Sequence, residues 1–164
     1  MKGITLIGMP GTGKSTIGKQ LAKQIGYYFL DLDILIKEKE GRSHADILKK
    51  DGEAKLLKLE NDYTLGLDLE KTVFSPGGSI IYSEPAMQKL KKETTIIYLA
   101  MPLLKIQNRL GSGMNQRGIV GLKEKGIKKL FMEREPLYAS FAHHTIDCAK
   151  IGDRAIASRI STLI

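Results

Sequence analysis

Short apolar segments alternate with segments of helical periodicity along the chain. Between the apolar segments, apolar residues recur every three or four positions, as in the series Ile17, Leu21 and Ile25. Five apolar segments are predicted as strands: Gly3 to Ile7, Tyr27 to Leu30, Thr72 to Ser75, Thr95 to Leu99 and Thr145 to Asp147. Strands that alternate with helices predict an α/β fold, with a central parallel five-stranded sheet and helices on both faces.

Capping residues mark several helix ends. Gly26 and Gly41 are predicted to stop the helices that precede them. Ser43 followed by Asp46 has the pattern of a capping box, and Ser83-Glu84-Pro85 has the pattern of a helix start. The glycine-rich polar stretch 111–118, between two helical patterns, is typical of a flexible lid.

Length and charge limit the classes of protein that need to be considered. The 164 residues fit one domain, 1–164, for which we expect substrate-binding helices at about 31–62 and a lid at about 111–126. A net charge of +8 favours anionic ligands, but the lysines are scattered and no nucleic-acid-binding module accompanies them. Cys148 is the only cysteine, so an intrachain disulfide is excluded. We expect a cytoplasmic monomer without nucleic-acid or membrane partners.

Residues 8–15 read Gly-Met-Pro-Gly-Thr-Gly-Lys-Ser, a complete phosphate-loop motif between a predicted strand and a predicted helix. The glycines allow backbone N–H groups to surround a phosphate, Lys14 can reach the outer phosphates, and the Ser15 hydroxyl can bind Mg²⁺. We therefore predict that the chain binds ATP with Mg²⁺. The residues expected to bind the nucleotide are Gly8, Gly11, Thr12, Gly13, Lys14, Ser15 and Thr16.

Asp31 and Asp33 close the second predicted strand. Ligands of parallel sheets gather at the carboxyl ends of the strands, so both carboxylates are expected beside the phosphate loop. The alternative for Asp33 is a cap on a helix that starts at Ile34. The sequence has no Asn-Lys-x-Asp motif for guanine, so a guanine-specific GTPase is not expected.

A series of short strings resembles the shikimate kinases, small P-loop kinases related to the nucleoside-monophosphate kinases. The matching strings are Gly8 to Thr16, Phe29 to Asp33, Gly41 to Ser43 with Ala45 to Ile47, Gly52-Glu53 with Glu60, Ser75 to Gly78, Tyr98-Leu99, Arg109, Arg117, and Arg134 to Tyr138. They follow the family's order over nearly the full chain. The resemblance implies a kinase of aromatic amino acid biosynthesis that transfers the γ-phosphate of ATP to a hydroxyl of shikimate.

The resemblance also implies roles on the acceptor side of the site. Asp33 would hold the acceptor's ring hydroxyls and take the proton of the attacking hydroxyl, while Asp31 and Ser15 would hold Mg²⁺. Gly77 and Gly78 match a glycine turn that approaches the substrate. Arg134 matches an arginine that binds the substrate carboxylate, although the residues alone also allow a surface charge there.

On the nucleotide side, the resemblance implies that Arg109 stacks on adenine and that Arg117 closes over the phosphates with the lid. Arg109 can also be a surface charge. Phosphoryl transfer needs positioning and positive charge around the migrating group. Lys14 and Arg117 would supply this charge, so with Asp33, whose role the resemblance implies, they are the expected catalytic residues.

Two residues depart from the family pattern. Leu57 stands where the family has a second carboxylate-binding arginine, and Ser79 replaces a third glycine. Lys55 or Lys58 could supply the missing cation, or Leu57 could simply pack in the core. We therefore expect poor use of shikimate, and two alternatives stay open: a related kinase for another alcohol, and a nucleotide-binding regulatory protein without kinase activity.

Overall fold

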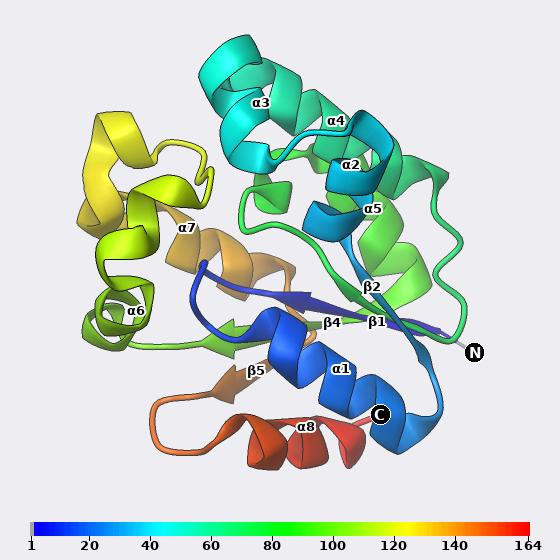
Figure 1. Cartoon of the computed structure of the whole chain (residues 1–164). Helices are drawn as coiled ribbons and strands as arrows, with labels where there is room; N and C mark the ends of the chain where they lie inside the picture. Colours follow the sequence, from blue (N-terminus) through cyan, green and yellow to red (C-terminus); the bar gives the residue numbers. More distant parts are fainter. Residues whose placement is uncertain (1) are drawn as a thin grey trace.

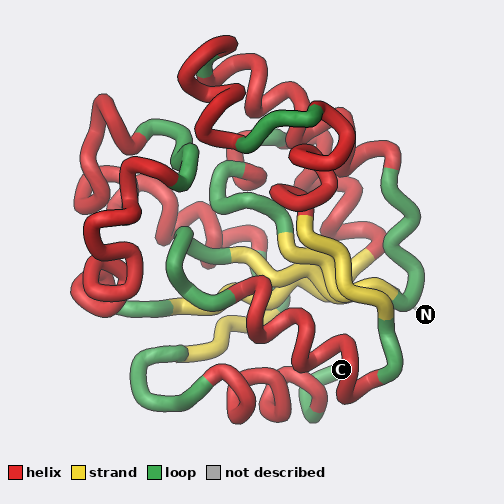
Figure 2. The backbone as a smooth tube through the Cα atoms, in the orientation of Figure 1, coloured by secondary structure: helices red, strands yellow, loops and turns green. Residues whose placement is uncertain are grey.

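The computed structural model describes residues 2–164 and is built around a five-stranded sheet in the order β2-β3-β1-β4-β5 (Figure 1; Figure 2). Each pair of neighbouring strands is parallel. The strands are β1 (Gly3–Ile7), β2 (Tyr28–Asp31), β3 (Thr72–Ser75), β4 (Thr94–Ala100) and β5 (His144–Asp147). The five predicted strands are thus confirmed, with ends that differ by at most one residue.

Helices cover both faces of this sheet, as predicted. They are α1 (Lys14–Ile25), α2 (Leu32–Glu40), α3 (His44–Asp51), α4 (Glu53–Gly66), α5 (Glu84–Glu93), α6 (Leu103–Leu110), α7 (Leu122–Phe141) and α8 (Asp153–Ser161), with 3₁₀ turns η1 (Ile80–Tyr82) and η2 (Gly111–Gln116). In Figure 1, α1 and α8 lie together on one face, while α4, α5 and α7 lie on the other. No helix within residues 2–164 has both the length and the apolar character needed to cross a membrane.

The centre of the sheet forms the core. Every residue of β1 and β3 is buried, because helices cover these strands on both sides. The buried hydroxyls of Thr5 and Thr94 pair with each other across β1 and β4 at 2.8 Å, so these polar groups do not remain unsatisfied. The buried sheet is thus a rigid base for the loops that project from the carboxyl ends of its strands.

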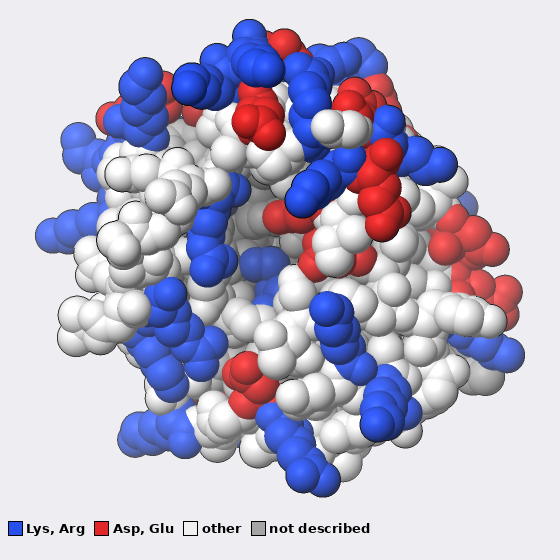
Figure 3. All heavy atoms as spheres, viewed as in Figure 1, with Lys and Arg blue, Asp and Glu red and all other residues white. Residues whose placement is uncertain are grey.

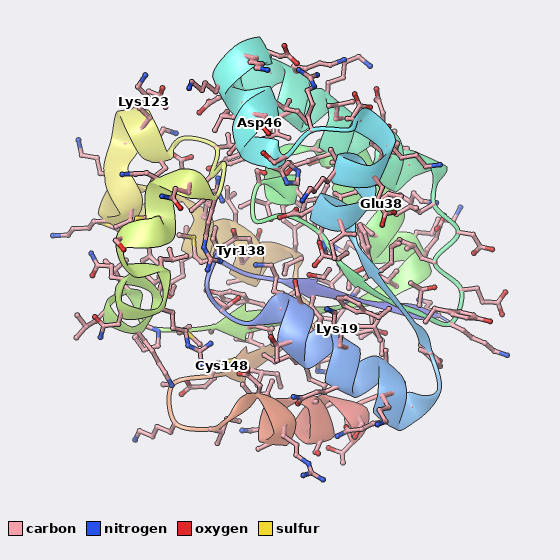
Figure 4. All side chains as sticks on the ribbon, in the orientation of Figure 1. Lys19, Glu38, Asp46, Lys123, Tyr138 and Cys148 are labelled. Atoms are coloured by element: carbon pink, nitrogen blue, oxygen red, sulfur yellow. The ribbon has the colours of Figure 1, made fainter. Side chains whose placement is uncertain are left out.

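The predicted helix ends are confirmed. Gly26 and Gly41 follow the last residues of α1 and α2 in left-handed conformations. Ser43 and Asp46 form both hydrogen bonds of a capping box, and Asp46 is labelled on the first turn of α3 in Figure 4. Ser83 accepts the Ala86 N–H at the start of α5.

The segment expected as a lid joins α6 to α7 and contacts the helices across the cavity. A side chain at Gly118 would bring its Cβ to 2.5 Å from Ala45 N, so the segment lies against the first turn of α3. The Gly121 N–H donates to Glu53 Oε1 on α4 at 2.6 Å. Helix α7 is interrupted at Gly126 (φ 71°, ψ 163°), where the expected segment ends.

Candidate active site

A cavity of about 420 Å³ opens where β1, β2 and β3 end. In Figure 3, positively and negatively charged side chains border the hollow on this face of the molecule. It is lined by these predicted residues: Gly11, Gly13, Lys14, Ser15, Thr16, Asp31, Asp33, Gly77, Gly78, Arg109, Arg117 and Arg134. Gly8 and Thr12, also predicted, are not among the lining residues; the Thr12 hydroxyl instead donates to Met9 O within the loop.

The phosphate loop forms one wall of this cavity. It connects β1 to α1 through positive φ angles at Gly11 (85°) and Gly13 (91°), which glycine adopts without steric cost. Gly13 caps α1 without a side-chain hydrogen bond, so the first N–H groups of the helix face the loop. A helix start of this kind attracts phosphate through its exposed N–H groups and its dipole.

The side chain of Lys14 folds back over the phosphate loop. Its Nζ donates to Gly8 O and to Met9 O, each at 2.9 Å. Burial lowers its pKa to about 8, although the nearby charge of Asp33 opposes this shift. The ammonium group thus remains charged at neutral pH and is already held beside the phosphate-binding backbone.

Asp31 joins the phosphate loop to α2. Its Oδ2 accepts the Ser15 hydroxyl at 2.5 Å, and its Oδ1 accepts the N–H groups of Asp33 and Ile34 at 3.0 and 3.3 Å. The alternative of Asp33 as a helix cap is therefore wrong: Asp31 caps α2, because the strand ends there and the helix begins at Leu32. This leaves the Asp33 carboxylate, 55% exposed, at the cavity.

The oxygen atoms of Ser15 and Asp31 fit a magnesium ion. Within residues 2–164, no three His, Cys, Asp or Glu side chains gather as a protein-only metal site. Mg²⁺ bound with a nucleotide needs only one or two protein oxygens, since phosphates and water complete its octahedral shell. One hydroxyl and one carboxylate beside a phosphate loop are such a donor set.

The turn after β3 lines another wall of the cavity. A Cβ on Gly77 would lie 2.7 Å from Glu60 Oε1, and one on Gly78 would lie 2.9 Å from Arg134 Nη1. The backbone therefore runs where a side chain has no room. Tyr138 of α7, labelled in Figure 4, donates its hydroxyl to Gly78 O at 2.6 Å and fixes the turn from behind.

Arg134 is buried in the wall of the cavity, with 1% of its surface exposed. Its Nη2 donates to Val120 O at 2.7 Å, and its Nε donates to the Tyr82 hydroxyl at 3.3 Å. The guanidinium also lies 5.3 Å from the centre of the Tyr82 ring. Because Arg134 is buried, the alternative of a surface charge is wrong. A buried cation of fixed geometry suits an anionic ligand.

Two further arginines line the cavity. Arg109 of α6 donates to Gly11 O at 3.4 Å and lies 3.8 Å from Asp153 Oδ1, with one third of its side chain exposed. Arg117 follows η2 and is exposed at the mouth of the cavity. The structure thus brings both residues to the cavity that the phosphate loop lines, Arg109 from α6 and Arg117 from within the segment expected as a lid.

The departures from the family pattern have clear structural positions. Leu57 is half-buried, packs against the core and does not line the cavity. Lys55 is exposed, and Lys58 forms an ion pair with Asp62 on the surface of α4. The alternative of a cation from Lys55 or Lys58 thus finds no support, since neither lines the cavity.

Sequence reasoning missed His44 at this site. It lines the cavity from the first turn of α3, and its Nδ1 lies 3.4 Å from Asp33 Oδ1. Its Nε2 lies 3.9 Å from Glu60 Oε1, and the Glu60 carboxylate accepts the Ser79 hydroxyl at 2.8 and 2.6 Å. No motif contains His44, and only the packing of three helices brings these groups together.

The parallel sheet, the phosphate loop after its central strand and the charged cavity define an ATP-dependent phosphotransferase of the P-loop class. A family model described as "Shikimate kinase" matches residues 10–164. The chain belongs to the shikimate kinase family.

Individual relatives agree with this assignment. A shikimate kinase of Persephonella marina is 36% identical over 140 residues, which is 85% of each chain. A shikimate kinase of Caldanaerobacter subterraneus subsp. tengcongensis is 36% identical over 160 residues, 95% of this chain and 90% of the relative. The solved structure of a shikimate kinase from Acinetobacter baumannii in complex with shikimate has a TM-score of 0.87 and 30% identity, covering 99% of this chain and 92% of that one.

Proposed function

We propose that this chain transfers the γ-phosphoryl group of ATP to a hydroxyl of shikimate, with Mg²⁺ as cofactor. The observation that carries the proposal is the arrangement of one cavity, in which the phosphate loop with Lys14 faces Asp33 and the buried Arg134. The relative from Acinetobacter baumannii, described in complex with shikimate, supports this acceptor.

The chain's own groups account for the parts of the reaction. The loop N–H groups and Lys14 would hold the phosphates, and Arg117 would add positive charge as the γ-phosphoryl group migrates. The acceptor oxygen forms a bond to γ-phosphorus while the bond from γ-phosphorus to the bridging oxygen breaks, so ADP leaves. The proton of the acceptor hydroxyl passes to the Asp33 carboxylate. When bound at Ser15 and Asp31, Mg²⁺ would neutralise charge on the phosphates.

Arg134 would orient the acceptor through its carboxylate. A guanidinium pairs with a carboxylate through two parallel hydrogen bonds, which fixes direction as well as distance. Arg134 is suited to this role because Val120 O and Tyr82 already hold its side chain in place. Little side-chain freedom remains to be lost when the acceptor binds.

A second candidate is the same phosphoryl transfer to a different hydroxylated anion. It is favoured by Leu57, which packs against the core and leaves Arg134 without a second arginine from α4. Loss of catalysis is the less favoured alternative, because Lys14, Asp31, Asp33 and Arg134 all line the same cavity.

The test is an ADP-release assay on the full chain with ATP, Mg²⁺ and shikimate. Cyclohexanecarboxylate is the matched control compound, because it keeps the carboxylate and has no hydroxyl to phosphorylate. We expect ADP release that depends on shikimate and is abolished by EDTA, with a phosphate monoester visible by phosphorus NMR. Release with another hydroxy acid but not with shikimate would favour the second candidate. Absence of release with every acceptor would contradict kinase activity.

A further inference from the structure

His44 lies between two carboxylates that come from two other helices. Its side chain is 7% exposed, with Nδ1 facing Asp33 of α2 at 3.4 Å and Nε2 facing Glu60 of α4 at 3.9 Å. The Nε2 atom is buried and has no hydrogen-bond partner. A buried polar atom without a partner is rare and costly, so its position calls for a physical explanation.

The charge of Glu60 offers that explanation. The Glu60 side chain is 3% exposed. Among residues 2–164, His44 is the only basic residue with a side-chain nitrogen within 4.0 Å of the Glu60 carboxylate. The hydroxyl of Ser79 is its neutral partner. A buried carboxylate needs a positive or hydrogen-bonding neighbour to be stable in ionised form.

The protonation states of imidazole can be compared directly. In either neutral tautomer one ring nitrogen carries a lone pair, which would face Asp33 or Glu60 and repel an ionised carboxylate. The imidazolium carries an N–H on both nitrogens and satisfies both neighbours. The cation therefore suits both neighbours where both carboxylates are ionised. Burial raises the pKa of Glu60 to about 7, and a protonated Glu60 can instead donate to a neutral Nε2 while Nδ1–H donates to Asp33.

The remaining charged groups around His44 also need to be considered. Burial disfavours the cation, but the hydrogen bond and charge of Asp33, followed by Glu60 and Asp31, raise the pKa of His44 above its ordinary value of 6.5. Lys37 and Arg117 line a small hollow beside the ring and act in the opposite direction. The carboxylates are the nearer groups, since both lie within 4.0 Å.

We propose that His44 is a positioning residue that holds the Asp33 carboxylate at the acceptor side of the cavity and anchors it to buried Glu60. This inference rests on the proposed function, in which Asp33 receives the acceptor's proton. Asp33 is 55% exposed on the first turn of α2, so without an anchor its carboxylate would sample several rotamers. The basic residue beside Glu60 is thus His44 of α3, while Leu57 of α4 packs against the core.

The first test is kinetic and uses His44→Gln in the full chain. Glutamine can still donate a hydrogen bond but has no charge. We expect kcat with shikimate to fall on the order of 10- to 100-fold, the usual cost of a misplaced reacting group, while the KM for ATP stays close to wild type. The melting temperature should fall, because buried Glu60 loses its basic neighbour. His144→Gln is the matched control, because His144 is exposed on β5, and it should keep wild-type kinetics. An unchanged kcat in folded His44→Gln would overturn the proposal.

The second test measures the proton itself and does not depend on turnover. The chain has 3 histidines, whose ring ¹⁵N signals can be titrated by NMR and assigned by elimination with His143→Gln and His144→Gln, even if His44→Gln does not fold. A kinetic pH profile is less suitable, since Lys14, with a pKa of about 8, adds an alkaline limb of its own.

We expect the pKa of His44 to lie above 6.5 in wild type and to fall in both Asp33→Asn and Glu60→Gln. A pKa at or below 6.5, or one unaffected by both substitutions, would overturn the anchoring role. If shikimate is not a substrate but the titration behaves as expected, the proposed function fails and the anchor stands.

Discussion

Of the two glycines in the turn after β3, Gly77 makes the closer approach to its neighbours, and adding one methyl group there tests that approach. In Gly77→Ala, the new Cβ would lie 2.7 Å from Glu60 Oε1 and 3.3 Å from Asp33 Oδ1. Gly77 is absent from the glycines with positive φ, so the backbone tolerates alanine and the effect is steric. An ordinary contact requires the Glu60 carboxylate to retreat by about half an ångström or more.

Glu60 has little room for that movement. It is 3% exposed and holds the Ser79 hydroxyl at 2.8 and 2.6 Å. A buried charged group that loses part of its hydrogen bonding costs about 1 to 3 kcal/mol. For a chain of this length, each kcal/mol lowers the melting temperature by about 2 to 4 °C. We also expect kcat/KM for shikimate to fall roughly 5- to 30-fold, which corresponds to about 1 to 2 kcal/mol.

The assay combines urea unfolding with steady-state kinetics. Gly66→Ala is the matched control, because a Cβ at this end of α4 meets nothing within 4 Å. It should be neutral or more stable by up to about 1 kcal/mol. In a Glu60→Asp background the cost of Gly77→Ala should shrink, since the shorter side chain leaves the site of the clash. Wild-type stability and kinetics in Gly77→Ala would refute the close approach.

Four further predictions concern individual residues. Lys14→Ala should lower turnover at saturating ATP by roughly 10³-fold or more, and retention of more than about a tenth would remove Lys14 from catalysis. Asp33→Asn should lower turnover about 10²- to 10⁴-fold while ATP affinity stays nearly intact. An equal loss of ATP binding, together with an altered circular dichroism spectrum, would indicate a structural role for Asp33. Leu57→Arg should lower the KM for shikimate if a second guanidinium reaches its carboxylate, and no gain in a folded variant would favour a different acceptor. Burial raises the pKa of Glu60 to about 7 despite the Ser79 hydrogen bond. The protonated Glu60 therefore stabilises the folded state fully below its ordinary pKa of 4.5, and this stabilisation is lost as pH rises to about 7. In Glu60→Gln the unfolding free energy should therefore change less between about pH 5 and pH 8 than in wild type, by on the order of 1 to 3 kcal/mol. The same pH dependence as in wild type would contradict the raised pKa.

The sequence by itself determined the features that depend on near neighbours in the chain. The strand β1, the phosphate loop and α1 are consecutive, so their apolar pattern and glycine spacing predicted both the structure and its ligand class. The helix ends at Gly26, Gly41 and Ser43 were predictable for the same reason, because caps are made within one turn.

The tertiary structure decided what depends on packing between distant segments. Asp31 rather than Asp33 caps α2, because the strand continues to Asp31 before the chain turns. Arg134 is charged and lies on a helix, and only its contacts with Val120 and Tyr82 show that it is buried. The group formed by His44 with Asp33, Glu60 and Ser79 has no local pattern, since it arises where α2, α3 and α4 meet. Short-range periodicity cannot specify such a meeting, because the free energy that creates it comes from burial of the whole core.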